Sequence, residues 1–112
     1  MKFSDIFETT SDDAVAQAKG FKKVKTNSSG GKTEWLKLKP GMEKAAAFLE
    51  SRRYGALLGA TAEFNKMEAV DLNKQDDKLY MSMSYIEKSM EKNAADPVDD
   101  IHVNKIAAGG VY

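Results

Sequence analysis

One acidic residue, Glu68, stands where a carboxylate could do chemistry. It follows the exit Gly59-Ala60-Thr61 and opens a run of alternating polarity, so we expect it at the edge of a strand. Strand ends on a rigid sheet hold ligand groups in fixed positions, and a carboxylate there could bind a hard cation such as calcium. From composition alone, the simpler interpretation is a surface glutamate at the start of a strand.

The other chemistry-bearing residues exclude several kinds of site. The chain has no cysteine, which excludes thiolate zinc, iron–sulfur ligation and a cysteine nucleophile in this chain. Its one histidine, His102, excludes a site that needs two, and no serine occupies the strand-to-helix elbow of a Ser-His-acid triad. The sequence has no phosphate loop, no dinucleotide-binding motif and no D-x-D-x-D-G calcium loop. Carboxylates leave a hard cation as the permitted metal.

Length and charge limit the function classes further. The 112 residues make one domain or a piece of one, and 17 Lys and Arg balance 17 Asp and Glu. A neutral balance argues against nucleic acid as the main partner. No apolar run approaches the length of a transmembrane helix, and residues 1–19 lack the pattern of a secretory signal.

The charges are spread unevenly along the chain. Eight lysines lie between Lys19 and Lys44 against two glutamates, and acids predominate from Glu87 to Asp100. We interpret both stretches as solvated surface. A basic nucleic-acid patch is the alternative, although only Phe21 and Trp35 could stack on bases there.

Hydrophobic spacing predicts a small α+β unit. Ser11 is the expected N-cap of a first short helix, and residues 33–38 alternate like a strand. Apolar residues then recur with helical spacing over about 42–58, with a bend or break expected near 51–55. Residues 101–106 are expected to form a last short strand.

After Gly59 the apolar period changes to two and predicts an antiparallel hairpin near residues 67–85. Its arms are residues 68–72 and 78–85, joined by a polar turn at 73–77. In the second arm we expect three apolar side chains inside and Ser82 more exposed. The inside residues are Leu79, Met81 and Met83.

Several of these residues fall in an order that resembles a known family. The shared pattern is a helix, a Gly-Ala-Thr exit, a basic-x-Glu step and an alternating strand. Its members here are Leu49, Ser51, Arg52, Ala56, Gly59-Ala60-Thr61, Lys66-x-Glu68 and Leu79-Tyr80-Met81-Ser82-Met83. This arrangement, over about residues 34–86, resembles an internal segment of the PhoX-type alkaline phosphatase family, in the bacterial branch often described only as a domain of unknown function.

The resemblance implies a β-propeller phosphomonoesterase that is periplasmic or extracellular and depends on calcium and iron. By position, Glu68 would be a metal ligand and Lys66 a contact to the phosphate of the ester substrate. Lys66 stands where the family has arginine, so it keeps the charge and loses the bidentate fork. The family's cysteine iron ligand and most of its metal carboxylates are missing from this chain.

Length limits what a chain of this family could do alone. The 112 residues supply two to three propeller blades at most, which cannot close a propeller and leave strand edges unpaired. We therefore expect a single partial domain, a fragment that needs the rest of the propeller chain or self-association, is inactive alone and need not hold a metal. The alternative is a non-catalytic binding or structural module derived from the same scaffold.

Overall fold

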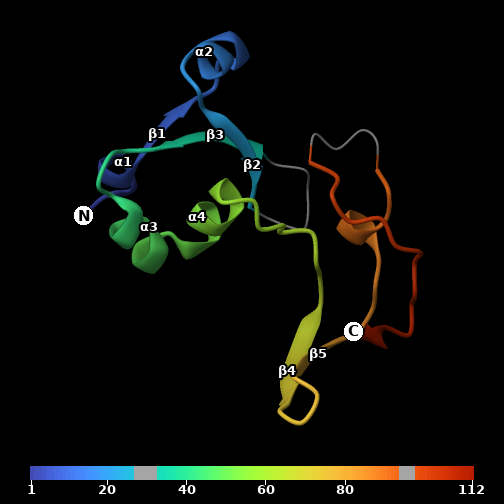
Figure 1. Cartoon of the computed structure of the whole chain (residues 1–112). Helices are drawn as coiled ribbons and strands as arrows, with labels where there is room; N and C mark the ends of the chain where they lie inside the picture. Colours follow the sequence, from blue (N-terminus) through green and yellow to red (C-terminus); the bar gives the residue numbers. More distant parts are fainter. Residues whose placement is uncertain (27–32, 94–97) are drawn as a thin grey trace. The chain divides into compact units, whose positions relative to one another are not determined.

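The computed structural model describes residues 1–26, 33–93 and 98–112 and divides the chain into two compact units, Met1–Ala62 and Glu63–Tyr112 (Figure 1). Each unit holds one antiparallel three-stranded sheet, so the chain is a small α+β protein. Glycine and serine at 27–31 predict a loop and Asp96-Pro97 predicts a turn, and both positions lie outside the described residues. The described residues show no closed propeller; a propeller fragment and a single partial domain stay predictions.

The first unit is a sheet with helices packed on one face. Its sheet has the order β1-β3-β2, and both neighbours pair antiparallel with β3. The helices α3 and α4 contribute side chains to the same core as the sheet. The elements are α1 (Phe3–Ile6), β1 (Phe7–Thr10), α2 (Asp13–Ala18), β2 (Lys22–Lys25), β3 (Thr33–Leu38), α3 (Glu43–Leu49) and α4 (Ser51–Leu57).

The helical segment predicted over 42–58 is present, but its break lies at Glu50, just before the expected 51–55. Glu50 has φ −136° and ψ 41°, outside the helical range, and α4 begins at the next residue. The break lets Ala46 of α3 be buried together with Leu36 of β3, while Tyr54 of α4 packs against the same cluster. One straight helix would not lay both segments on this small sheet.

Two smaller predictions at other positions need correction. The N-cap of α2 is Asp12 rather than Ser11: the Asp12 carboxylate accepts hydrogen bonds from the backbone N–H groups of Ala14 and Val15 at 2.9 and 3.0 Å. A carboxylate at this position also suits the positive end of the helix. Residues 101–106 form no strand; only Ile106 makes a bridge, to Ile86.

The second unit is built on the predicted hairpin. Strand β4 (Met67–Asn73) pairs antiparallel with β5 (Lys78–Met83), and β6 (Gly110–Val111) pairs with the other edge of β5. A 3₁₀ turn at Lys88–Met90 follows. The pairing of the two predicted arms is confirmed, although the second arm ends at Met83 rather than at residue 85.

The core of the second unit covers only one end of this hairpin. Met83, Ile86 and Met90 are buried, and Met81 packs against them as a partly buried residue. Leu79 was expected inside and is 63% exposed, so that prediction is wrong. The face was assigned correctly, but the core is too small to reach the end of the hairpin near the turn.

A buried carboxylate, Glu63, anchors a loop of the second unit. Glu63 is 1% exposed, and its Oε2 accepts hydrogen bonds from the backbone N–H groups of Asp100 and Ile101, both at 2.7 Å. The Ser89 hydroxyl donates to the Glu63 carbonyl at 2.7 Å. These bonds satisfy backbone donors in a segment that has no strand pairing of its own.

In the described residues no helix is long and apolar enough to cross a membrane.

Candidate functional site

The two residues assigned by the resemblance, Lys66 and Glu68, both lie at the base of the hairpin. Lys66 precedes β4 and has φ +50°, and its carbonyl accepts a hydrogen bond from the N–H of Ser84 at 3.1 Å. Glu68 is the extra residue of a β-bulge, because Met67 lies opposite Met83 while Ala69 lies opposite Ser82. Both Lys66 and Glu68 are exposed.

Each of these side chains already has a neighbour within the unit. The Glu68 carboxylate accepts a hydrogen bond from the Ser84 hydroxyl at 3.0 Å, and the Lys66 ammonium lies 5.4 Å from the centroid of the Tyr85 ring. Residues two apart in a strand point to the same face, so Lys66 and Glu68 are expected to share a face if the strand runs from Lys66. That condition is not met, because β4 begins at Met67.

The acidic and histidine side chains of the described residues do not converge: no group of three or more of them is placed to hold a metal ion. Glu68 as a metal ligand and Lys66 as a phosphate contact therefore stay predictions that rest on the resemblance. A lone carboxylate supplies at most two of the six to eight oxygens that calcium takes.

A cleft of about 860 Å³ opens in the first unit, beside the end of β1. It is lined by Phe3, Thr9, Thr10, Ser11, Asp13, Lys23, Thr33, Glu34 and Trp35. Its charged groups are paired inside the unit: Asp13 accepts from the Trp35 indole N–H and lies 3.7 Å from the Lys23 ammonium. Glu34 accepts from Arg53 at 2.9 and 3.1 Å, and this hydrogen bonding raises the pKa of the guanidinium. A ligand in this cleft would compete with these contacts.

The aromatic residues considered for base stacking are each covered by a lysine on one face. The Lys23 ammonium lies 5.1 Å from the centroid of the Trp35 ring, and the Lys37 ammonium lies 5.9 Å from that of Phe21. These are cation–π contacts within the unit. They give the lysine-rich stretch a local structural role, and a nucleic-acid patch there stays an untested alternative.

The second unit presents an unpaired strand edge along β4. In the sheet order β4-β5-β6 of the described residues, no strand pairs with the outer edge of β4. Met81 of β5 exchanges two backbone hydrogen bonds with Tyr112, at 2.8 and 2.9 Å, so its N–H and C=O point away from β4. Backbone groups alternate in an antiparallel ladder. Val70, opposite Met81, and Leu72, opposite Leu79, therefore direct their backbone groups to the free edge.

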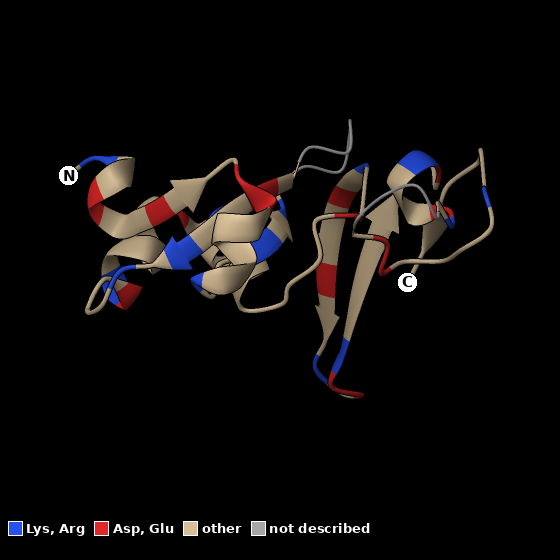
Figure 2. Ribbon diagram, turned by 90° about the horizontal axis from the view of Figure 1, so that it is seen from above, with Lys and Arg blue, Asp and Glu red and all other residues tan. Residues whose placement is uncertain are grey.

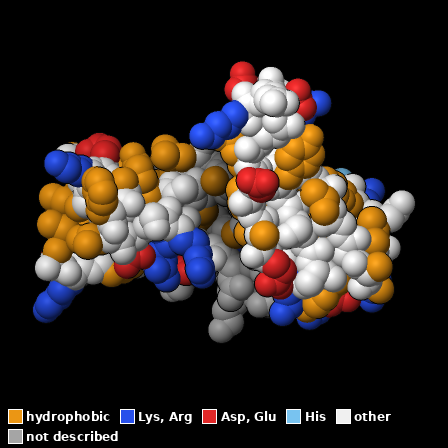
Figure 3. Space-filling model, turned by 90° about the horizontal axis from the view of Figure 1, so that it is seen from below, with side chains coloured by type: hydrophobic (Ala, Val, Ile, Leu, Met, Phe, Trp, Pro, Cys, Tyr) orange, Lys and Arg blue, Asp and Glu red, His pale blue; other side chains and the backbone are white. Residues whose placement is uncertain are grey.

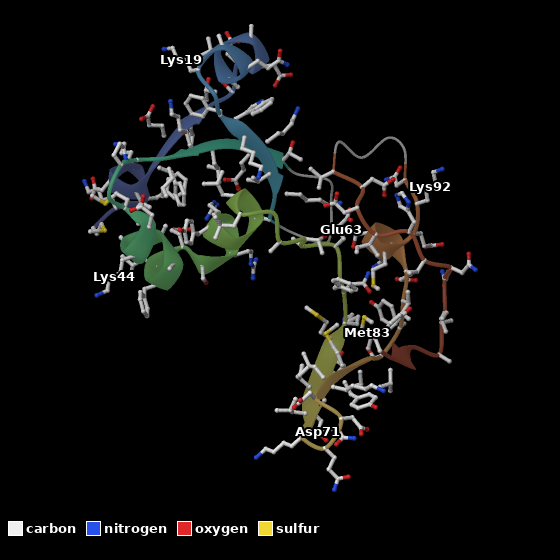
Figure 4. All side chains as sticks on the ribbon, in the orientation of Figure 1. Lys19, Lys44, Glu63, Asp71, Met83 and Lys92 are labelled. Carbon is white, nitrogen blue, oxygen red and sulfur yellow. The ribbon has the colours of Figure 1, made fainter. Side chains whose placement is uncertain are left out.

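One of these edge groups is covered by the neighbouring side chain. The N–H of Leu72 donates to the Asp71 carboxylate at 2.9 Å. Asp71 itself lies opposite Tyr80, and its own backbone groups belong to the ladder with β5. Figure 4 shows Asp71 in the hairpin, while Met83 lies at its base. Asp71 thus shields part of an edge that would otherwise be ready to pair.

The edge borders an exposed apolar stripe, which consists of Val70, Leu72 and Leu79. Their exposed fractions are 61%, 52% and 63%. Val70 and Leu72 are two residues apart, and Leu72 lies directly opposite Leu79, so all three share one face of the sheet. Figure 3 shows hydrophobic side chains on the molecular surface in one view. The hairpin thus offers open backbone groups and apolar side chains in the same place.

Sequence reasoning located this hairpin and expected unpaired strand edges, but it did not identify the outer edge of β4 as one of them. It assigned no face to the first arm, in which the side chains of Val70 and Leu72 are exposed. Asp71, between two apolar residues of a strand, is a signal that could have pointed to an edge, because charged residues commonly protect edge strands.

Comparison with known proteins adds no relative: no family model, no curated protein and no solved structure matches the chain. The resemblance to the PhoX-type family therefore stays a prediction from the motifs.

Proposed function

We propose that the chain is a non-catalytic binding module that takes up an extended segment of a partner protein as an additional strand along the free edge of β4. The observation that carries the proposal is the coincidence of outward backbone groups and exposed apolar side chains at Val70 and Leu72. In such strand addition the main-chain hydrogen bonds supply affinity and alternate side chains supply specificity.

Burial of the apolar stripe would drive the association. An added strand next to β4 places its side chains beside Val70 and Leu72 on the face that also carries Leu79. Because an added strand covers these side chains from one side, each contributes less than the roughly 1.5–3 kcal/mol of full burial. Stable sheets bury one face, and the end of this hairpin near the turn has nothing from its own core over it.

The charge of the second unit favours a basic partner segment. Glu63–Tyr112 contains ten Asp and Glu against six Lys, a formal charge of −4, whereas Met1–Ala62 carries +4. Glu68 and Asp71 lie in β4 itself, and Figure 2 shows acidic positions along this strand. Complementary charge speeds encounter and selects partners more than it adds affinity.

Proline at residue 72 tests the proposal, because the Leu72 N–H faces the free edge and takes no part in the ladder with β5. Leu72→Pro should abolish binding of a fluorescein-labelled peptide with the alternating core Ser-Val-Lys-Val-Ser, measured by fluorescence polarisation on the full chain. Proline is tolerated at an edge strand where its nitrogen faces solvent. In the unmodified chain, the peptide should shift the amide resonances of Val70 and Leu72.

Leu72→Val is the matched control, because it keeps the N–H and an apolar side chain that suits a strand, and it should bind within about threefold of the unmodified chain. Retention of the Asp71–Tyr80 pairing in Leu72→Pro, seen as amide protection, shows that the hairpin is intact. Equal binding by Leu72→Pro with an intact hairpin, or peptide-induced shifts confined to the first unit, would contradict strand addition at β4.

The phosphatase-fragment hypothesis predicts a different experimental result. We expect the isolated chain to show no turnover of an aryl phosphate with added calcium and iron, because one carboxylate and one ammonium do not make a hydrolytic centre. Turnover that survives purification and disappears in Glu68→Gln would show that Glu68 ligates a catalytic metal, with the site completed by association of chains.

A further inference from the structure

We infer that Asp71 selects the partner strand, by requiring a lysine or arginine directly opposite it between two apolar residues. The inference rests on the proposed strand addition at β4 and adds the chemistry of the segment that is taken up. It follows from the place of Asp71 in the alternation of the strand and from the hydrogen bond that its carboxylate makes.

The position opposite Asp71 brings side chains close together. Because the backbone groups of Asp71 point toward β5, an antiparallel strand added at the free edge meets Asp71 as a non-hydrogen-bonded pair. In such pairs the two Cα atoms are only about 4.5 Å apart, closer than in hydrogen-bonded pairs. The partner residues on either side meet Val70 and Leu72 on the apolar face. The fitting segment therefore reads apolar, basic, apolar.

Strand addition also releases the Asp71 carboxylate. In the free chain this carboxylate accepts the N–H of Leu72 at 2.9 Å. An added antiparallel strand needs the same N–H for its own carbonyl, because Leu72 is an outward-facing position. The carboxylate then loses its backbone donor at the moment when a partner side chain arrives beside it. A lysine or arginine replaces the lost contact, a neutral residue does so weakly, and an acid repels.

The same residue opposes pairing with a second copy of this chain. The β-bulge at Glu68 leaves residues 69–73 as the regular part of the edge, and Asp71 is its central residue. Antiparallel pairing of two copies over this whole stretch places Asp71 against Asp71 of the second copy in the close pair. Like charges directly opposite each other destabilise a sheet. The edge is thus open to a basic strand and unfavourable to its own copy.

Three peptides that differ only at the central position test the inference on the full chain: Ser-Val-Lys-Val-Ser and the same sequence with serine or glutamate in place of lysine. We expect the serine peptide to bind about threefold and the glutamate peptide about tenfold more weakly than the lysine peptide in low salt. High salt should reduce the differences.

Two variants assign the preference to Asp71. Asp71→Asn should bind all three peptides within about twofold and should self-associate at a lower concentration in sedimentation velocity than the unmodified chain, and Asp71→Lys should prefer the glutamate peptide. The same lysine preference in Asp71→Asn would overturn the inference while leaving strand addition in place. Binding of none of the peptides to the unmodified chain would instead overturn the proposed function, and the inference with it.

Discussion

Replacement of Met83 by aspartate is expected to unfold the second unit and to leave the first folded. Met83 is 3% exposed in a core that it shares with Ile86 and Met90. A charge without a partner in such a place costs about 3–5 kcal/mol, which is a large part of the stability of a small unit. The hairpin amide resonances should lose their dispersion. Trp35, the only tryptophan, lies in the first unit and should keep its unfolding transition in urea.

Leu79→Asp is the matched control, since it introduces the same side chain into the same strand and on the same face. Leu79 is 63% exposed, so the new carboxylate stays in water and the free energy of unfolding should change by less than about 1 kcal/mol. Equal destabilisation by both variants would mean that the core extends to the hairpin end near the turn. A shifted Trp35 transition in Met83→Asp would mean that the two cores unfold as one.

The contrast between Met83 and Leu79 also shows how far the sequence could predict the fold. Period-two spacing identified β5 and placed both residues on one face, because alternation is a local property of an extended chain. It could not show where the covering core ends. That core consists of Met83, Ile86 and Met90 with Phe64, Ile101 and Val103 packed against it, from segments without a periodic pattern. Burial along a strand depends on such contacts between distant segments.

The candidate site was predictable only in part, for a related reason. Lys66 was singled out by the resemblance, and Glu68 by the resemblance and by its place at the start of a strand; the structure gives each a neighbour within the unit, Tyr85 and Ser84. The bulge at Glu68 and the left-handed backbone of Lys66 have no signature in the sequence, because both depend on the pairing with β5. The free edge of β4 is also a property of sheet order, for which Asp71 between two apolar residues is the local sign in the sequence.

Loss of the Glu63 carboxylate should destabilise the second unit nearly as much as a charge in its core. Glu63→Ala removes the oxygen that accepts the N–H groups of Asp100 and Ile101 at 2.7 Å each. The two N–H groups are only partly buried, and a hydrogen bond to a charged group contributes about 1.5–3 kcal/mol, so we expect a loss of about 3–6 kcal/mol at most in urea unfolding. The amide protons of Asp100 and Ile101 should exchange faster than those of β5, because the loop that they belong to loses its anchor.

The size of the effect depends on burial and on the number of donors, which two further variants separate. Glu63→Gln keeps an oxygen acceptor and loses the charge, so it should cost less than Glu63→Ala, since charge-assisted bonds are about twice as strong as neutral ones. Glu91→Ala removes a carboxylate that accepts a single exposed N–H, from Lys88 at 3.1 Å, and should cost less than about 1 kcal/mol. Glu63 and Glu91 would be indistinguishable in this series only if the segment after residue 98 were held by its apolar contacts alone. Unchanged exchange at Asp100 and Ile101 in Glu63→Ala would establish that case, because the loop would then keep its place through Ile101 and Val103 in the core.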